Sequence, residues 1–112
     1  EIHRTVCWSC CRCTEPDGYL YTSRTMNPAH PHQWAGSRRW EKVEELSHEF
    51  YNLGHMIEGA IAHYQATGQR NFFDIAIRYA DCVCREIGEG PGNWYVYPDI
   101  RLRKWLWLNF IL

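Results

Sequence analysis

Apolar residues recur every three or four positions in the middle of the chain, and this spacing predicts two helices. The first helix runs from about Glu41 to Ala66, with an inward stripe of Leu46, Phe50, Leu53, Ile57, Ile61 and Tyr64. Gly68 stands where a left-handed residue commonly ends a helix. A second helix follows and stops at Gly88, with Phe72, Ile75 or Ala76, Tyr79, Val83 and Ile87 inward. Because the connection is short, the two helices should lie antiparallel as an αα-hairpin.

The opposite face of the first helix carries histidines and small residues, where an exposed face usually carries Lys and Glu. This strip comprises His48, Tyr51 or Asn52, His55, Gly59 and Ala62. Gly54 and Gly59 each cost the helix up to about 1 kcal/mol relative to Ala, which favours a close approach by another backbone or a ligand. We therefore expect both faces of the helix to be covered.

Two interpretations of the histidines stay open. In one, His48 and His55 are packing residues with hydrogen bonds to neighbouring elements. In the other, they line a groove and hydrogen-bond to hydroxyls, since neutral imidazole offers one donor and one acceptor. Their separation of seven residues is too large for an ordinary shared metal.

Composition and charge narrow the class of protein. The chain has 112 residues, of which 46% are hydrophobic, and this fits one domain with a core. Its net charge of −1 gives no sign of a nucleic-acid partner or an electrostatic membrane anchor. The N-terminus lacks the apolar core of a signal peptide, and no apolar run reaches the roughly 18 residues of a membrane span. The chain opens without Met and stops inside a hydrophobic run, which is typical of a fragment.

Four of the six cysteines lie in CWSCCRC, residues 7–13, and the other two lie in CVC, residues 82–84. Adjacent cysteines cannot easily bond to each other, and a helical core makes a disulfide scaffold unnecessary. A small zinc module is an alternative, built on Cys7, Cys10, Cys11 and Cys13. A structural zinc site usually has two separated ligand pairs, however, and Cys82 and Cys84 would point to different sides of a helix.

Three motifs in one register carry a family resemblance: DGYL at 17–20, HE-x-Y-x-x-GH-x-IE at 48–58, and AHYQATGQRNFFDIAIRYAD at 62–81. Together they resemble the bacterial β-L-arabinofuranosidase family, glycoside hydrolase family 127, over residues 15 to about 90. The resemblance implies an all-α fold in which the antiparallel helix pair is a fragment of an (α/α)6 barrel. It also implies a retaining hydrolase that removes terminal arabinofuranosyl groups from plant-type glycans.

The resemblance also implies an unusual catalytic pair, a zinc-held cysteine thiolate as nucleophile and a glutamate as general acid/base. These residues and the zinc ligands lie downstream of the matched segment, so no catalytic residue and no metal ligand is assigned in this chain. We expect zinc only in the full-length enzyme, and the isolated chain to be inactive.

The resemblance makes His48 a substrate-binding candidate, because it matches a family position expected to contact sugar hydroxyls. His55 and Tyr51 share its helix strip and are further candidates. The expected partner is an arabinose-containing carbohydrate, with no nucleic acid and no membrane.

The two ends of the chain depart from the family pattern. Codons that could encode Asn93 to Leu112, read two bases out of phase, can spell LVCVPGHQIAEMALAKFYI, which has the strand–turn–helix pattern of the family. CWSCCRC read one base later becomes a run of Ala or Val with one Gly. The hypothesis is that residues 1–14 and 93–112 are frameshifted segments that flank a family segment at 15–92.

A helical-repeat interaction module is a further alternative. Residues 62–81 have small and aromatic residues on a helix pair and a Thr-Gly turn, as in tetratricopeptide repeats. Such modules need about three repeats of roughly 34 residues, and the sequence contains no second copy.

Overall fold

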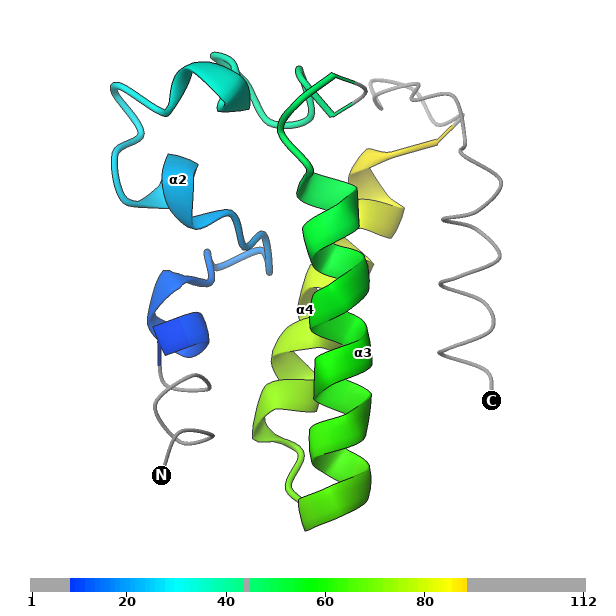
Figure 1. Ribbon diagram of the computed structural model, residues 1–112. Coiled ribbons are helices and arrows are strands. Elements are labelled where there is room, and N and C mark those ends of the chain that lie inside the picture. The colour runs from blue at the N-terminus through cyan, green and yellow to red at the C-terminus, as the bar shows by residue number, and fades with distance from the viewer. Residues whose placement is uncertain (1–8, 44, 89–112) are drawn as a thin grey trace.

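The computed structural model describes residues 9–43 and 45–88, and within them the regular structure is helical (Figure 1). Residues 9–13 are helical, and the elements that follow are α2 (Thr22–Thr25), the 3-10 turn η1 (Gln33–Ala35), α3 (Glu49–Thr67) and α4 (Asn71–Glu86). The described residues form no β-strand, so the all-α class is confirmed.

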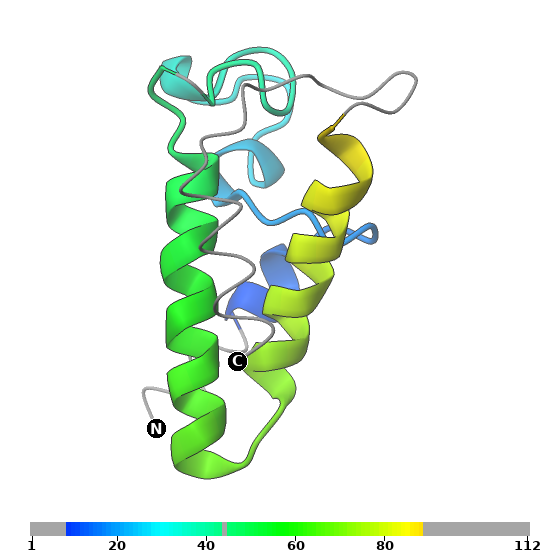
Figure 2. The ribbon, with the colours of Figure 1, turned by 90° about the vertical axis from the view of Figure 1, so that its right-hand side faces the viewer.

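The two long helices, α3 and α4, pack against each other as an antiparallel pair, side by side in both Figure 1 and Figure 2. Gly68 joins them in a left-handed conformation with φ 70°, and its N–H donates to the Tyr64 carbonyl at 2.8 Å. The predicted hairpin and its glycine stop are therefore confirmed. The second helix ends at Glu86, two residues before Gly88.

The core between α3 and α4 follows most of the predicted stripe. Its buried members are Leu53, Ile57, Ala60, Ile75, Ala76, Tyr79, Ala80, Cys82 and Val83. Phe50 and Ile61 are partly buried against it. Leu46 and Tyr64, the two ends of the predicted stripe, were expected inside, but they are 45% and 38% exposed. The buried stripe is therefore shorter than predicted.

The predicted start of the first helix at Glu41 is wrong, because α3 begins at Glu49. Two non-glycine residues ahead of it, Trp40 and His48, have φ of 66° and 54°, and a right-handed helix cannot run through them. Trp40 is only 1% exposed and its ring stacks on Phe50 at 5.5 Å. The chain therefore turns to bury the Trp40 indole, and the helical spacing around Leu46 belongs to a turn.

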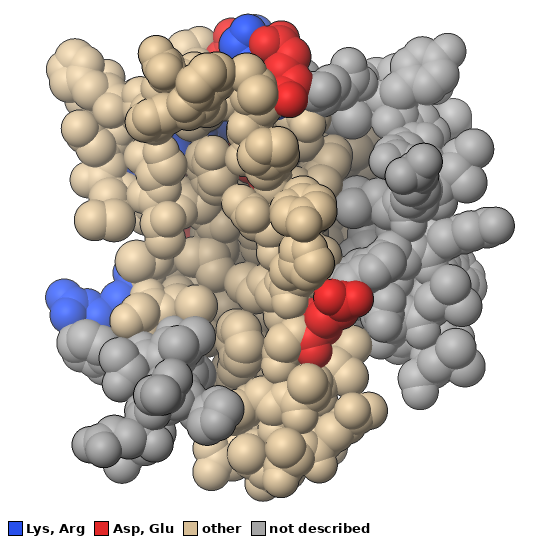
Figure 3. Space-filling view, in the orientation of Figure 1, with Lys and Arg blue, Asp and Glu red and all other residues tan. Residues whose placement is uncertain are grey.

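The histidine strip of α3 was expected to be covered, but in the described structure it is exposed. Its members are His48, Tyr51, Asn52, His55, Gly59 and Ala62. A Cβ on Gly59 would meet the Phe72 ring at 3.7 Å, which is an ordinary contact, so no close approach requires this glycine. Among the described residues, few charged side chains lie on the face turned to the viewer in Figure 3.

The N-terminal segment, blue to cyan in Figure 1, lies beside the helix pair and is attached to α4. Arg78 donates to the Pro16 carbonyl at 3.2 Å, and Arg85 donates to the Asp17 carbonyl at 2.5 Å. Tyr19 is fully buried, with edge-to-face ring contacts to Trp40 and Tyr79. The DGYL motif thus docks the segment on the helix pair.

Gly18 lies at the closest point of this docking, and its φ of 98° falls in the region that side chains rarely adopt. A Cβ at Gly18 would overlap the backbone carbonyl of Arg78. We expect Gly18→Ala to destabilise the chain more than Gly68→Ala. Gly68 has φ 70° but open space around it, so its substitution should cost only the backbone strain, about 1–3 kcal/mol. Urea unfolding of both variants measures the difference, and equal losses would contradict the close approach.

Candidate functional site

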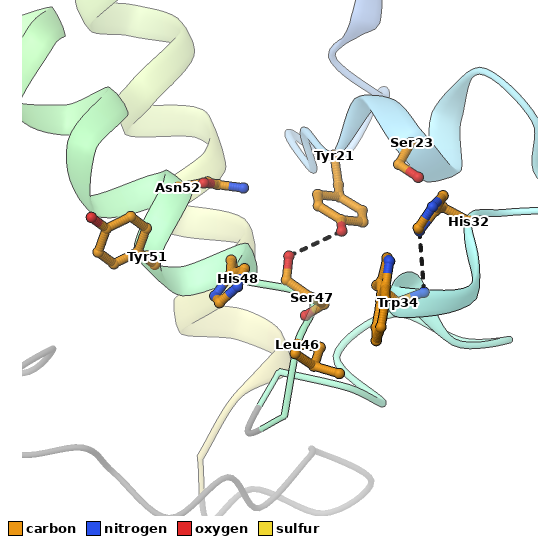
Figure 4. A pocket seen from close by; sticks show the side chains of 9 residues that line it. All are labelled: Tyr21, Ser23, His32, Trp34, Leu46, Ser47, His48, Tyr51 and Asn52. Carbon is orange, nitrogen blue, oxygen red and sulfur yellow. Dashed lines mark hydrogen bonds between the residues drawn. The ribbon is translucent and has the colours of Figure 1, made fainter.

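An open pocket of about 650 Å³ lies where the loops before α3 meet the first turns of that helix (Figure 4). Nine residues line it: Tyr21, Ser23, His32, Trp34, Leu46, Ser47, His48, Tyr51 and Asn52. They come from three segments of the chain, so the pocket exists only when the N-terminal segment has docked on the helices.

The α3 side of the pocket contains two of the three candidates from the sequence. His48 precedes the helix with φ 54° and ψ 22°, and Tyr51 follows one turn later. Their rings lie 6.1 Å apart. His55 does not line the pocket. It contacts the Tyr51 ring at 4.5 Å, and its Nδ1 lies 3.3 Å from a Glu58 carboxylate oxygen. The structure thus brings His48 and Tyr51 together and leaves His55 one turn away.

The opposite side comes from the loop around η1, which supplies His32 and Trp34 (Figure 4). The His32 Nδ1 accepts a hydrogen bond from the Trp34 backbone N–H at 3.3 Å. Neither residue was a candidate from the sequence. The signal that could have found them is the stretch NPAHPHQWAGS, a loop that carries histidines and a tryptophan without helical spacing.

A buried carboxylate holds the backbone beneath His48. Glu49 is fully buried, and it accepts hydrogen bonds from the Tyr19 hydroxyl at 2.5 Å and from the Ser47 hydroxyl at 2.7 Å. Tyr21 donates to the Ser47 carbonyl at 3.0 Å (Figure 4). Burial and the Glu49 hydrogen bond raise the pKa of Tyr19 far above its ordinary value, so Tyr19 remains a donor.

A second cluster of titratable groups lies away from the pocket, where the N-terminal segment meets α4. Asp17, Cys82 and Glu86 form the one group of three possible metal ligands in the described part of the chain, with ligand atoms within 4.8 Å of one another. The Arg39 guanidinium already pairs with Asp17 at 2.5 Å, with Glu86 at 2.9 Å and with Glu15.

This second cluster does not fit a metal ion. A metal would have to displace Arg39 from two carboxylates. Burial and the charge of Glu86 raise the pKa of the Cys82 thiol to about 12, whereas a metal ligand must be a thiolate. The cluster is instead an ion-pair network that ties three segments together.

The cysteine-rich start of the chain is described only in part. Cys11 and Cys13 are free thiols, and Cys7 lies outside the described residues. Of the two segments in the frameshift hypothesis, 1–14 and 93–112, residues 1–8 and all of 93–112 likewise fall outside them. None of the helices in the described residues combines the length and apolar character that crossing a bilayer requires.

An antiparallel helix pair with an open, partly polar pocket at one end defines a segment of an all-α domain built from helix pairs. The family model for β-L-arabinofuranosidase, the GH127 catalytic domain, matches residues 1–101. The chain belongs to this glycoside hydrolase family. This membership leaves the tetratricopeptide-like and zinc-module alternatives without support.

Individual relatives agree with the family. The chain is 33% identical over 94 residues to a non-reducing end β-L-arabinofuranosidase of Bifidobacterium longum subsp. longum, an alignment that covers 81% of the chain and 14% of that protein. A solved GH127 β-arabinofuranosidase is 61% identical, with a TM-score of 0.88, and the match covers 96% of this chain and 17% of that one.

A second solved relative is a GH127 β-L-arabinofuranosidase from Geobacillus stearothermophilus T6. It is 37% identical, with a TM-score of 0.69, and the match covers 82% of this chain and 13% of that one. The chain thus spans less than a fifth of each relative. Its helix pair is confirmed as a fragment of the family's all-α catalytic fold, the (α/α)6 barrel. The family match includes residues 1–14, and the frameshift hypothesis for the two ends stays a prediction.

The Tyr19–Glu49 hydrogen bond yields a stability prediction. Tyr19→Phe removes a donor from a fully buried carboxylate, and we expect a loss of about 1–3 kcal/mol in the free energy of unfolding. Tyr51→Phe is the matched control, because Tyr51 is 65% exposed and its change should stay within about 0.5 kcal/mol. Urea unfolding measures both, and a Tyr19→Phe loss as small as the control would contradict the role of Glu49.

The Arg39 network yields a pH prediction. The hydrogen bond from Arg39 holds the pKa of Asp17 below its ordinary value of 3.8. A depressed folded-state pKa contributes stability above the unfolded-state pKa, and this is lost as pH falls through the folded-state pKa. Below pH 3.8, stability should therefore fall more steeply in the unaltered chain than in Asp17→Asn.

A double-mutant comparison checks this origin. In an Arg39→Gln background the depression of the Asp17 pKa should become smaller, because only backbone donors such as the Tyr19 N–H then lower it, so adding Asp17→Asn should change the slope below pH 3.8 less. Urea unfolding across a pH series gives the four slopes. A slope difference that is equally large without Arg39 would show that Arg39 is not the main cause.

Proposed function

We propose that this chain forms one wall of the sugar-binding site in a hydrolase that removes terminal β-L-arabinofuranosyl groups. The observation that carries the proposal is the position of His48, which heads α3 in a left-handed conformation and lines an open pocket. In that position its imidazole can donate to one sugar hydroxyl and accept from another.

The other polar groups of the pocket suit the same ligand. Asn52 offers an amide and Ser23 a hydroxyl, so the pocket combines donors and acceptors around aromatic side chains, whereas the Tyr51 hydroxyl points away from the other lining side chains (Figure 4). Carbohydrate ligands present many hydroxyls in fixed directions, and a few convergent polar groups fix their orientation. The substrate class comes from the names of the relatives, which are arabinofuranosidases, one of them acting at the non-reducing end.

His48 and Tyr51 are the substrate-binding residues in this proposal. His55 does not contact the sugar in this proposal. It supports Tyr51, because its ring lies against the Tyr51 ring at 4.5 Å and outside the pocket. His48 and Tyr51 bind and orient the sugar.

The nucleophile, the general acid/base and the zinc ligands belong in this proposal to the remainder of the catalytic domain, which is more than four-fifths of each relative. The second cluster at Arg39 does not fit zinc, and this proposal gives Cys82 no catalytic role. We expect the isolated chain to be inactive and the intact enzyme to act on arabinose-containing carbohydrate.

The test places the chain in the solved relative that is 61% identical, as a chimera in which the chain replaces the segment it matches. We expect His48→Ala in this chimera to weaken binding of methyl β-L-arabinofuranoside by about 3- to 10-fold, which is the contribution of one neutral hydrogen bond. His55→Ala is the matched comparison, with an expected change of about 2-fold or less, because His55 does not line the pocket. Calorimetric titration measures both, and unchanged affinity in His48→Ala would contradict the proposal.

A further inference from the structure

We propose that Trp34 is a stacking platform for a second ring of the substrate, the ring that follows the terminal sugar in its leaving group. The site would then prefer glycosides whose leaving group carries a ring over those with a small alkyl group. This proposal rests on the proposed sugar-binding function of the same pocket.

Trp34 is a large aromatic side chain that is partly exposed to solvent beside polar groups. It is 45% exposed, although its neighbour in sequence, Ala35, is fully buried. In Figure 4 the indole is seen edge-on, with a ring face turned toward the side where Leu46 and Ser47 lie. An exposed indole face of this size is an apolar surface that a ligand ring can cover.

A buried arginine holds the backbone that follows Trp34. Arg24 is 8% exposed, and its guanidinium donates to the carbonyl of Ala35, to that of Gly36 at 3.1 Å and to that of Arg38 at 2.9 Å. One side chain thereby fixes three carbonyls directly after the tryptophan.

The same loop is also anchored at both of its ends. On one side of Trp34, the His32 carbonyl accepts from the Ala35 N–H at 2.8 Å, and the two rings of His32 and Trp34 lie within 28° of parallel. On the other side, the Glu41 carboxylate accepts from the backbone N–H groups of Ser37 and Arg38 at 2.6 and 3.0 Å. Trp34 is therefore presented on a fixed backbone, which lowers the entropy lost when a ligand stacks on it.

The two walls of the pocket carry different kinds of side chain. The α3 wall carries the polar side chains His48 and Asn52, which suit the hydroxyls of a terminal sugar, and the loop wall carries the Trp34 indole. The C–H faces of a sugar ring and the face of an aromatic ring both stack on an indole, so the shared requirement is a ring. The volume of about 650 Å³ lies in the range that holds ligands larger than one five-membered sugar.

The experiment compares three ligands on the complete chain by protein-observed NMR titration: methyl β-L-arabinofuranoside, 4-nitrophenyl β-L-arabinofuranoside and an arabinofuranosyl disaccharide. We expect the chain to bind the ring-bearing ligands about 2- to 10-fold more tightly than the methyl glycoside. Trp34→Ala should reduce this preference to about 1-fold, because it weakens binding of the ring-bearing ligands more than binding of the methyl glycoside. The two ring-bearing ligands separate a preference for a second sugar from one for an aromatic ring.

Two further variants keep the result decisive. Trp34→Phe retains a ring face and should keep most of the preference for ring-bearing ligands. A loss of folding would remove the preference in both variants, so the two variants are compared. Tyr64→Ala is the matched control, because Tyr64 is also partly exposed at 38% but stacks on Phe73, outside the pocket. Circular dichroism confirms helix content in each variant, and the same variants in the chimera give kcat and KM for the ring-bearing ligands.

Four results would overturn the proposal. A preference that survives Trp34→Ala would show that another surface binds the second ring, and equal weakening of all ligands would place Trp34 in the binding of the terminal sugar itself. A loss of stability in the Trp34→Ala chimera without a change in preference would show that another part of the catalytic domain covers the indole. Absence of binding by the unaltered chain and the unaltered chimera would contradict the proposed function as well.

Discussion

The buried carboxylate of Glu49 is the constraint on which the rest of this segment depends. It lies in the first turn of α3, where the helix dipole favours a negative charge, and is fully buried. Removing a carboxylate from water is costly unless donors replace the water, and the Tyr19 and Ser47 hydroxyls do so. Tyr19 belongs to the docked N-terminal segment and Ser47 to the loop before the helix. One acid therefore joins three parts of the chain at the helix start.

The same constraint positions the candidate site. His48 lies between Ser47 and Glu49, and both neighbours point into the interior, so the backbone at His48 reverses with a positive φ. Left-handed non-glycine residues cost about 1–3 kcal/mol and persist where surrounding contacts dictate them. At His48 the result is an imidazole that lines the pocket. The hydrogen bonds that bury Glu49 therefore also set the position of the pocket wall at His48.

The parts of the structure that sequence reasoning predicts are those with local causes. Helical spacing at Leu53 and Ile57 and the left-handed Gly68 act within a few residues, and the helix pair follows from them. The start of α3 and the loop wall depend on contacts between distant residues, such as Trp40 on Phe50 and Arg24 on the carbonyls after Trp34. Such contacts produce no regular spacing of residues in the sequence. His48 and Tyr51 were found by their spacing, but spacing alone could not show that the pocket ends before His55.

The contacts of the DGYL segment have a kinetic consequence. The hydrogen bonds from Arg78 and Arg85 to the Pro16 and Asp17 carbonyls bridge 62 and 68 residues of chain, whereas the α3–α4 hairpin closes over a three-residue turn. Contacts that close long loops form more slowly than local ones. During synthesis the N-terminal segment leaves the ribosome before α4, and it cannot dock until α4 has also emerged. The hairpin should therefore fold early, and the two walls of the pocket should meet only in a late step of folding.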